Sequence, residues 1–228
     1  MNKQMTAFSA TDLLRRIFSR GWREVHGLRT AAAQARWRQR LPTLPRADDG
    51  RHLLHLGCGD IDAPGFINVD ARSLPHVHIV TKRLFDLYMV PDGAVDLVYM
   101  CHVLEHVAHQ ELHPTLVELR RVLKAGGLLR VSVPDFDKML DIYHQTDKDI
   151  LAIEPPMMGG QDYAFNFHYS LFNAARLKQS LEAAGFRDVQ SWDPARCDHH
   201  PFIDWANRQH FHGGRGYDVS LNLEANAC

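Results

Sequence analysis

The sequence lacks the features that mark membrane-spanning, secreted and disulfide-rich proteins. No uninterrupted apolar run approaches the roughly 18 residues that cross a bilayer, and no early apolar stretch has the form of a signal peptide. The four cysteines are scattered and form no Cys-x-x-Cys pair, which favours free thiols over bridges. We therefore expect a cytoplasmic protein without a disulfide framework.

An excess of charge of one sign is also lacking, because the 228 residues have a net charge of −1 and ordinary shares of hydrophobic (45%) and charged (23%) residues. These values predict one globular domain of moderate size with a small appendage. The charge is unevenly distributed: residues 1–50 have ten basic and four acidic side chains, a net of +6, and the remainder has a net of −7. We expect a basic N-terminal extension (1–46) before an acidic domain (47–228).

The extension has the pattern of an amphipathic helix. From Leu13 to Arg23, apolar side chains share one half of the helical circumference and four arginines occupy the other half. Prolines at 42 and 45 then indicate a linker. Three roles stay open for the helix: packing over the domain as a lid, peripheral contact with an anionic membrane through residues 11–23, or binding of a partner.

From residue 47 onward, short apolar runs alternate with helical spacing. Leucines recur at helical intervals over residues 112–123, and Gly126-Gly127 would end that helix. Asn173 can cap a second helix. Seven strands are expected, over residues 52–56, 66–70, 77–80, 95–100, 128–133, 186–192 and 217–224. The alternation predicts an α/β fold with a mostly parallel seven-stranded sheet and helices on both faces.

Two segments, residues 147–172 and 193–216, fit neither the helical nor the strand period. The first contains a dense aromatic cluster at residues 163–169. In open parallel sheets, ligands bind beyond the carboxyl ends of the strands, on loops of this kind. We therefore expect both insertions to contact a substrate.

A glycine turn follows the first expected strand. Gly57-Cys58-Gly59 would let the backbone approach a ligand closely, with amides directed at it. Asp70 ends the next strand, where a carboxylate can accept both hydrogen bonds of a ribose diol. Taken alone, the glycines could equally mark a tight strand end.

The spacing around this turn argues against dinucleotide cofactors. A dinucleotide fingerprint has a third glycine, where this chain has Asp62, and an acidic residue about 20 positions on. Asp70 follows Gly57 by only 13 residues, and residues 60–65 are too few for a crossover helix. The phosphate-binding pattern G-x-x-x-x-G-K-[ST] is also missing, so NAD, FAD and nucleoside triphosphates are disfavoured.

Six motifs occur in order along the central part of the chain: Leu56-Gly-Cys-Gly59, Asn68-Val-Asp70, Phe85-Asp-Leu87, Val95-Asp-Leu-Val98, Cys101-His-Val-Leu-Glu-His-Val107 and Arg121-Val-Leu-Lys-Ala-Gly-Gly-Leu128. Together they resemble the class I S-adenosylmethionine-dependent methyltransferases, which have a Rossmann-like seven-stranded sheet. The resemblance covers residues 52–134 closely and residues 159–186 more loosely. This combination of motifs is similar to a bacterial subgroup associated with cell-surface polysaccharide biosynthesis. In that subgroup the connection after the first strand is also shortened.

The resemblance implies S-adenosyl-L-methionine as the cofactor. The glycine turn would face its methionine part, Asp70 its ribose hydroxyls and Asp86 its adenine amino group. The residues implied in cofactor binding are Gly57, Cys58, Gly59, Asp70, Asp86, Leu87, Cys101 and His102. As isolated carboxylates, Asp70 and Asp86 would be no more than solvated strand ends.

Methyl transfer to a hydroxyl needs a group that takes up its proton, and histidine suits this near neutral pH. His168 is the first catalytic candidate because it lies in the aromatic insertion, and His106 is the second. Each could instead pack and hydrogen-bond within the fold, and Glu105 is expected to belong to the scaffold. The acceptor implied is a hydroxyl of a sugar or glycan precursor; another small molecule, or cofactor binding without catalysis, is the alternative.

No metal site is expected. Residues 197–212 contain cysteine, histidine and aspartate, but their spacing matches no zinc pattern, and a polar surface loop is the preferred interpretation. Nucleic acid is not expected as a partner, because residues 99–102 lack the Asn/Asp-Pro-Pro-aromatic signature of base-amine methylation and no broad basic surface accompanies the aromatic cluster. The sequence gives no indication of the oligomeric state.

Overall fold

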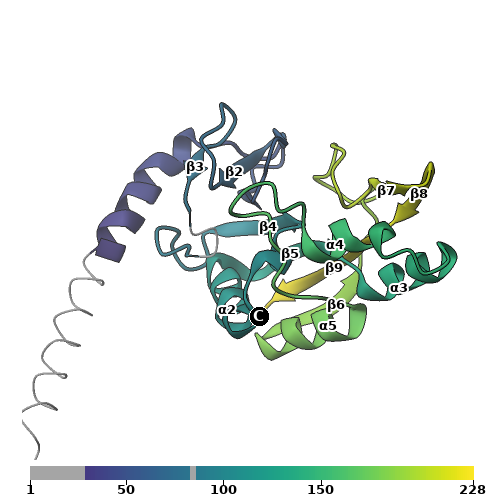
Figure 1. Cartoon of the computed structure of the whole chain (residues 1–228). Coiled ribbons are helices and arrows are strands. Elements are labelled where there is room, and N and C mark those ends of the chain that lie inside the picture. Colours follow the sequence, from purple (N-terminus) through teal and green to yellow (C-terminus); the bar gives the residue numbers. More distant parts are fainter. Residues whose placement is uncertain (1–28, 83–85) are drawn as a thin grey trace, which may run out of the picture. The chain divides into compact units, whose positions relative to one another are not determined.

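The computed structural model in Figure 1 describes residues 29–82 and 86–228. The amphipathic helix expected at residues 11–23 lies outside the described residues. The chain divides into two compact units, Met1–Pro42 with Tyr88–Pro91 and Thr43–Leu87 with Asp92–Cys228. Residues 29–40 are helical, and the 3-10 turn η1 (Leu41–Thr43) follows them. Within the described ranges, no helix is both long enough and apolar enough to cross a membrane.

The larger unit is built on a seven-stranded sheet with the strand order β3-β2-β1-β4-β5-β9-β6. Its strands are β1 (Leu53–Leu56), β2 (Phe66–Asp70), β3 (Ile79–Val80), β4 (Val95–Cys101), β5 (Leu123–Pro134), β6 (Phe186–Ser191) and β9 (Ser220–Ala227). Neighbouring strands are parallel except at β9, which is antiparallel to both β5 and β6. The mostly parallel seven-stranded sheet is therefore confirmed.

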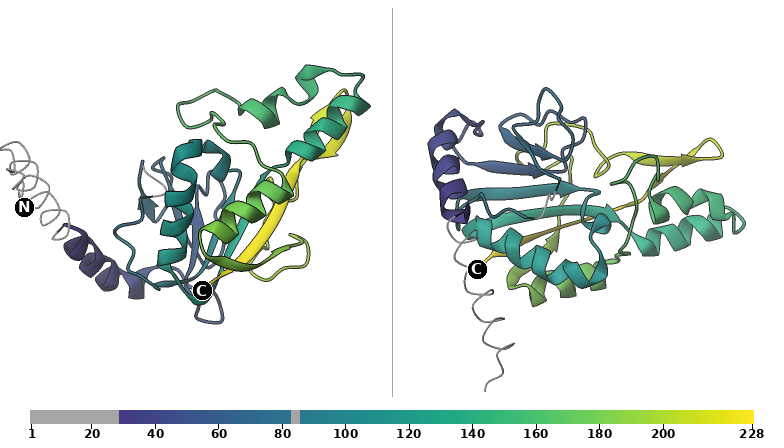
Figure 2. Two further views of the ribbon diagram at one scale, coloured as in Figure 1. Left: turned by 90° about the horizontal axis from the view of Figure 1, so that it is seen from below. Right: turned by 60° about the vertical axis from the view of Figure 1, so that its left-hand side comes forward.

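Helices flank this sheet, as predicted. α2 (Leu112–Val122) and α5 (Ala174–Ala183) lie side by side against it in both views of Figure 2. The Asn173 side chain accepts a hydrogen bond from the Arg176 amide (3.0 Å), which confirms the expected cap of α5. Other helical elements lie along the same part of the chain: η2 (Leu104–His106), η3 (His109–Glu111), α3 (Phe136–Gln145), η4 (Ile150–Ala152) and α4 (Glu154–Met158).

Two predicted boundaries are wrong. The pair Gly126-Gly127 does not end α2, because the helix stops at Val122 and β5 begins at once with Leu123, which pairs with Val95. The register then shifts between β4 and β5, and the glycines lie inside this irregularity. The strand expected at residues 217–224 is two strands, since the chain breaks at Val219, whose carbonyl accepts the Asp135 amide (2.8 Å).

The first of those strands, β8 (Arg215–Asp218), pairs with β7 (Gln209–His212) in a separate hairpin, which extends away from the main sheet in Figure 2. Neither the hairpin nor α3 was expected. The hairpin turn is Gly213-Gly214, both with positive φ (+55° and +80°). Such a two-residue turn is typical of hairpins.

An aromatic core lies on one face of the main sheet. Phe66, Tyr99 and Trp192 are buried there, and Phe202 and Ala206 from the second insertion pack against them. Residues 193–216 therefore supply part of the core. The connection after β1, residues 57–65, contains no helix, as its length predicted.

Candidate functional site

The turn after β1 has glycine at two positions that share a backbone conformation but differ in the space around them. Gly57 and Gly59 have left-handed φ values of +63° and +57°. A Cβ atom on Gly57 would lie 2.5 Å from Cγ2 of Val103, whereas one on Gly59 would meet only the Arg72 guanidinium at 3.5 Å. The Gly57 amide donates to the Val69 carbonyl (2.8 Å), which fixes the turn to the end of β2.

Asp70 is the central acceptor of this turn. It is 6% exposed, and its Oδ2 accepts the Gly59 amide (2.8 Å). Its Oδ1 accepts the Arg72 amide (2.8 Å) and, at 3.4 Å, the Arg72 Nε–H. A carboxylate has about four acceptor positions, so one stays open and a second opens if the Arg72 side chain moves.

A cavity of about 790 Å³ opens beside the turn. Five of the residues implied in cofactor binding line it: Gly57, Gly59, Asp70, Asp86 and His102. Side chains that were not expected complete its wall, among them Arg72, Lys82, Val103, Thr115 and Tyr163.

The remaining three residues implied in cofactor binding lie elsewhere. Leu87 is buried, and its carbonyl accepts a hydrogen bond from Arg121 (3.0 Å). Cys58 and Cys101 face a second cavity of about 510 Å³. Burial, together with the charge of Asp70, raises the pKa of the Cys58 thiol to about 12.

The second cavity adjoins the first. Both are lined by Gly57, Gly59, Arg72, His102, His106 and Tyr163. Both insertions contribute to the second cavity: Asp162, Asn166 and His168 come from the first, and Asp204, Trp205 and Arg208 from the second. Ligands bound in the two cavities would therefore meet at the glycine turn.

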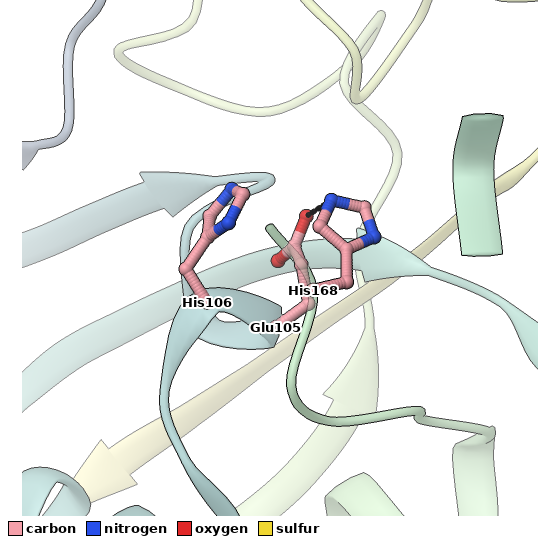
Figure 3. Close-up of side chains that lie close together, drawn as sticks. All are labelled: Glu105, His106 and His168. Atoms are coloured by element: carbon pink, nitrogen blue, oxygen red, sulfur yellow. Dashed lines mark ion pairs between the residues drawn. The ribbon is translucent and has the colours of Figure 1, made fainter. Parts of the chain in front are cut away.

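Glu105 lies among histidines that line these cavities. It is 1% exposed, and neither carboxylate oxygen has a hydrogen-bond partner among the described residues. Oε1 lies 3.7 Å from Nδ1 of His102 and 3.7 Å from Nε2 of His168. Figure 3 shows the carboxylate between the rings of His106 and His168, whose centroids are 4.8 Å apart. We call Glu105, His106 and His168 the histidine–glutamate cluster.

Burial controls the protonation of these groups. It raises the pKa of Glu105 to about 8. It lowers the pKa of His168 to about 4, helped by the nearby His106, and it lowers the pKa of His106 as well. The pKa of His102 falls to about 3 for the same reason. All three imidazoles are therefore neutral at pH 7.

Comparisons with known proteins bear on the family and the fold of the chain. Residues 54–131 match a family model described as a methyltransferase domain. A crystal structure of a SAM-dependent methyltransferase from Archaeoglobus fulgidus has the same fold, with a TM-score of 0.50 and 17% identity over 86% of this chain and 94% of that one. Residues 54–131 therefore resemble a methyltransferase domain in sequence, and the larger unit has a fold seen in a solved methyltransferase.

Two proteins named as probable S-adenosylmethionine-dependent methyltransferases are similar in sequence to this domain. The one from Mycolicibacterium smegmatis is 31% identical over 156 residues, which are 60% of this chain and 52% of the relative. One from Mycobacterium tuberculosis is 30% identical over 158 residues, 61% of this chain and 50% of the relative. The chain spans about half the length of the curated relatives it matches.

The second insertion differs from the polar surface loop that was expected at residues 197–212. His200 and Asp204 are buried, and Asp204 accepts a hydrogen bond from the Tyr99 hydroxyl inside the aromatic core. Burial alone would raise the pKa of Asp204, but hydrogen bonds from His200 and Tyr99 outweigh it and lower the pKa. His212 pairs instead with Asp149 (2.9 Å), so these metal-ligand types are distributed over separate places.

Two side chains near the cavities had no role in the sequence-based prediction of the site, Glu105 and Arg72. Glu105 was expected to belong to the scaffold, and the spacing His-x-x-Glu-His within residues 102–106 is the one local signal that places it near two histidines. Arg72 follows the acidic strand end by two residues and carries no motif of its own. Only the folded chain places it over Asp70 and 5.9 Å from the ring centre of Tyr163.

Proposed function

We propose that this protein is an S-adenosylmethionine-dependent methyltransferase that binds its cofactor in the larger cavity. The observation that supports this most strongly is that one cavity gathers the glycine turn, Asp70 and Asp86. The cavity fits the cofactor chemically, because a sulfonium cation is favoured beside carboxylates and a backbone without side chains lets it approach. When bound, S-adenosylmethionine supplies an electrophilic methyl group.

In this proposal, different residues of the larger cavity bind different parts of the cofactor. The turn from Gly57 to Gly59 faces the methionine part, and Asp70 accepts the ribose hydroxyls. Asp86 accepts the adenine amino group. Because Asp70 already accepts three N–H groups, holding both hydroxyls requires the long Arg72 Nε contact (3.4 Å) to open. Arg72, which also pairs with Asp60 (3.5 Å), could then contact the cofactor or the acceptor, since it borders both cavities.

The proposed acceptor is a hydroxyl of a sugar or glycan precursor. The smaller cavity combines Asp162, Asn166 and Arg208, which can hydrogen-bond a polyhydroxylated ligand, with the aromatic side chains Tyr163 and Trp205, on which the apolar face of a sugar ring can stack. Binding sites fix orientation by a few such placed polar groups. A different small molecule would meet the same groups, so the substrate panel must include both kinds.

Methyl transfer by this arrangement depends mainly on positioning. The acceptor oxygen must lie about 3 Å from the methyl group and opposite the sulfur. The acceptor proton must also be removed, and His168, followed by His106, could accept it at Nε2. Both side chains border the smaller cavity.

Calorimetry and turnover test this proposal together. S-adenosylhomocysteine should bind the purified chain, and Asp70→Asn should weaken binding about 10-fold or more, because a hydrogen bond to a charged group contributes about 1.5–3 kcal/mol. The matched control is Asp141→Asn, an exposed aspartate of α3. Failure of the unaltered, folded protein to bind would overturn the proposal.

The acceptor is tested separately by release of S-adenosylhomocysteine across a panel of nucleotide sugars, lipid-linked sugars and hydroxylated metabolites. Product with a sugar and none with the other compounds supports the glycan assignment. Tight cofactor binding with no turnover on any acceptor would favour a binding module without catalysis.

The basic extension adds a proposed location. Arginines on one face of residues 11–23 would hold the protein on anionic lipid, where a lipid-linked acceptor is found. Flotation with vesicles of 30% phosphatidylserine tests this: the full chain should float, and a variant with Arg15, Arg16, Arg20 and Arg23 replaced by glutamine should not. Equal recovery of both would contradict it.

A further inference from the structure

We propose that the histidine–glutamate cluster binds a divalent transition-metal ion through Glu105, His106 and His168. One ligand atom from each of these side chains lies within 4.8 Å of the other two. The three come from two segments far apart in the sequence, η2 and the first insertion, and Figure 3 shows that their side chains point toward one another. Local structure alone would not bring them together.

The hydrogen bonds around the cluster fix which nitrogen of each ring carries the proton. His106 Nδ1 donates to the Phe167 carbonyl (2.9 Å), and His168 Nδ1 donates to the Pro156 carbonyl (3.1 Å). A carbonyl oxygen can only accept, so the proton of each neutral ring is on Nδ1 and each Nε2 has a free lone pair.

His102 lies beside the cluster, and its hydrogen bond also fixes which of its nitrogens carries the proton. The Ser220 hydroxyl donates to the Trp205 carbonyl (2.6 Å), so it can only accept from His102 Nε2 (2.7 Å). The Nδ1 lone pair of His102 then faces Glu105 at 3.7 Å.

A buried group of acceptors without a donor is unfavourable by itself. Both Glu105 oxygens are buried and lack a partner within the described structure, which costs free energy unless a proton or a cation compensates. A cation bound to all three side chains would satisfy the two imidazole lone pairs and the carboxylate at the same time.

The distances fit two ligands of one ion better than a hydrogen bond. The 3.7 Å between Glu105 Oε1 and His168 Nε2 is too long for a hydrogen bond. Two atoms that each lie about 2.0–2.2 Å from the same ion, at tetrahedral or octahedral angles, are about 3.0–3.5 Å apart. A shift of a few tenths of an ångström would bring Glu105 and His168 to this separation, and the ligand atom of His106, which lies within 4.8 Å of both, would have to approach them as well.

The outer contacts are also those of a metal site. Histidine ligands generally donate their second ring N–H to a carbonyl or carboxylate, as His106 and His168 do here. Two imidazoles with one carboxylate favour zinc, iron, cobalt or manganese over magnesium and calcium, which prefer oxygen ligands.

The location of the site suggests its use, and this step rests on the proposed function. His106 borders both cavities, so an ion held there would lie where cofactor and acceptor meet. It could coordinate the acceptor oxygen and orient it toward the methyl group. A histidine that holds an ion by Nε2 cannot also take up a proton there, so coordination and the base role are exclusive.

Metal titration of the full chain tests the inference. After removal of bound metal with a chelator and gel filtration, Zn²⁺ should bind at one ion per chain, and Co²⁺ should give the visible absorption of a protein-bound site. Glu105→Gln and His168→Ala should each weaken Zn²⁺ binding at least about 100-fold and abolish the Co²⁺ spectrum. The matched control is His113→Ala, an exposed histidine of α2 that should leave both unchanged.

Two further measurements make the result decisive. Thermal unfolding checks that each variant is folded, and calorimetry with S-adenosylhomocysteine checks the cofactor cavity independently of the metal. Zn²⁺ binding that the Glu105 and His168 substitutions do not change, or no Zn²⁺ binding by the unaltered chain, overturns the inference even where S-adenosylhomocysteine binds. Metal binding at this cluster without S-adenosylhomocysteine binding would uphold the site and overturn the proposed function.

Discussion

Gly57 and Gly59 share the left-handed conformation, yet only one of them is enclosed. Replacing either by alanine imposes the backbone cost of that conformation, about 1–2 kcal/mol. Gly57→Ala also drives a methyl group into Val103, at 2.5 Å, and overpacking of this kind adds about 1–3 kcal/mol. We expect Gly57→Ala to lower the free energy of unfolding more than Gly59→Ala, measured by urea denaturation. Equal losses would contradict the close packing of the turn.

His55 is a second residue whose environment gives a prediction. It is buried under Tyr99 and Phe202, and burial lowers its pKa to about 4. An unfolded histidine has a pKa near 6.5, so below that pH the unfolded state binds the proton and the folded state does not. The stability that neutral His55 contributes is therefore complete above pH 6.5 and is lost as the pH falls toward 4.

We expect His55→Phe to reduce the loss of stability on acidification. The slope of unfolding free energy against pH between 6.5 and 4.5 should fall by up to about 1.4 kcal/mol per pH unit, the value for one proton. Urea midpoints at four pH values measure it, and other buried histidines cancel in the comparison. Parallel curves for the two proteins would show that His55 is not neutral when buried.

Single residues also show what the sequence could and could not predict about the site. The positions of Gly57, Gly59 and Asp70 at strand ends were predictable, because a glycine turn and the end of an apolar run are local signals in the sequence. The proximity of Glu105 to His168 was not predictable, because a different segment of the chain brings His168 to it. Whether a buried carboxylate has a hydrogen-bond partner is a property of the fold, and no local pattern reports it.

At the scale of elements, the start of α5 gives the clearest test. Asn173 accepts the Arg176 amide (3.0 Å) as the cap of this helix. Asn173→Ala should therefore cost about 1 kcal/mol of unfolding free energy, and Asn173→Asp should retain most of it, because both asparagine and aspartate cap well. Urea denaturation of the three proteins measures this. An alanine variant as stable as the unaltered chain would show that water replaces the cap.

Elements were predicted best where their pattern was continuous. β2 has the predicted bounds, Phe66–Asp70, because five consecutive buried residues lie between turn signals. β5 was predicted too short, because Gly126-Gly127 was interpreted as the end of the preceding helix. The irregular pairing with β4 that places these glycines inside the strand depends on a distant part of the chain. The hairpin β7–β8 was not predicted, because each of its two strands is held extended by pairing with the other.

At the scale of the whole molecule, cofactor binding should raise the free energy of unfolding. A ligand that binds only the folded state adds about 2.7 kcal/mol at 100 times its dissociation constant. We expect S-adenosylhomocysteine to raise the urea midpoint of the unaltered chain and to have a much smaller effect on Asp70→Asn at the same concentration. Equal shifts would mean that the ligand binds away from the turn.

The burial of Cys58 has a consequence for chemical resistance. The thiolate is the form that alkylating agents and peroxides attack, and a thiol with a pKa of about 12 is almost entirely protonated at neutral pH. Iodoacetamide should therefore label the exposed Cys228 and spare Cys58 in the folded chain. A cysteine in the middle of the turn is therefore protected from peroxide by the same burial that holds the turn in place.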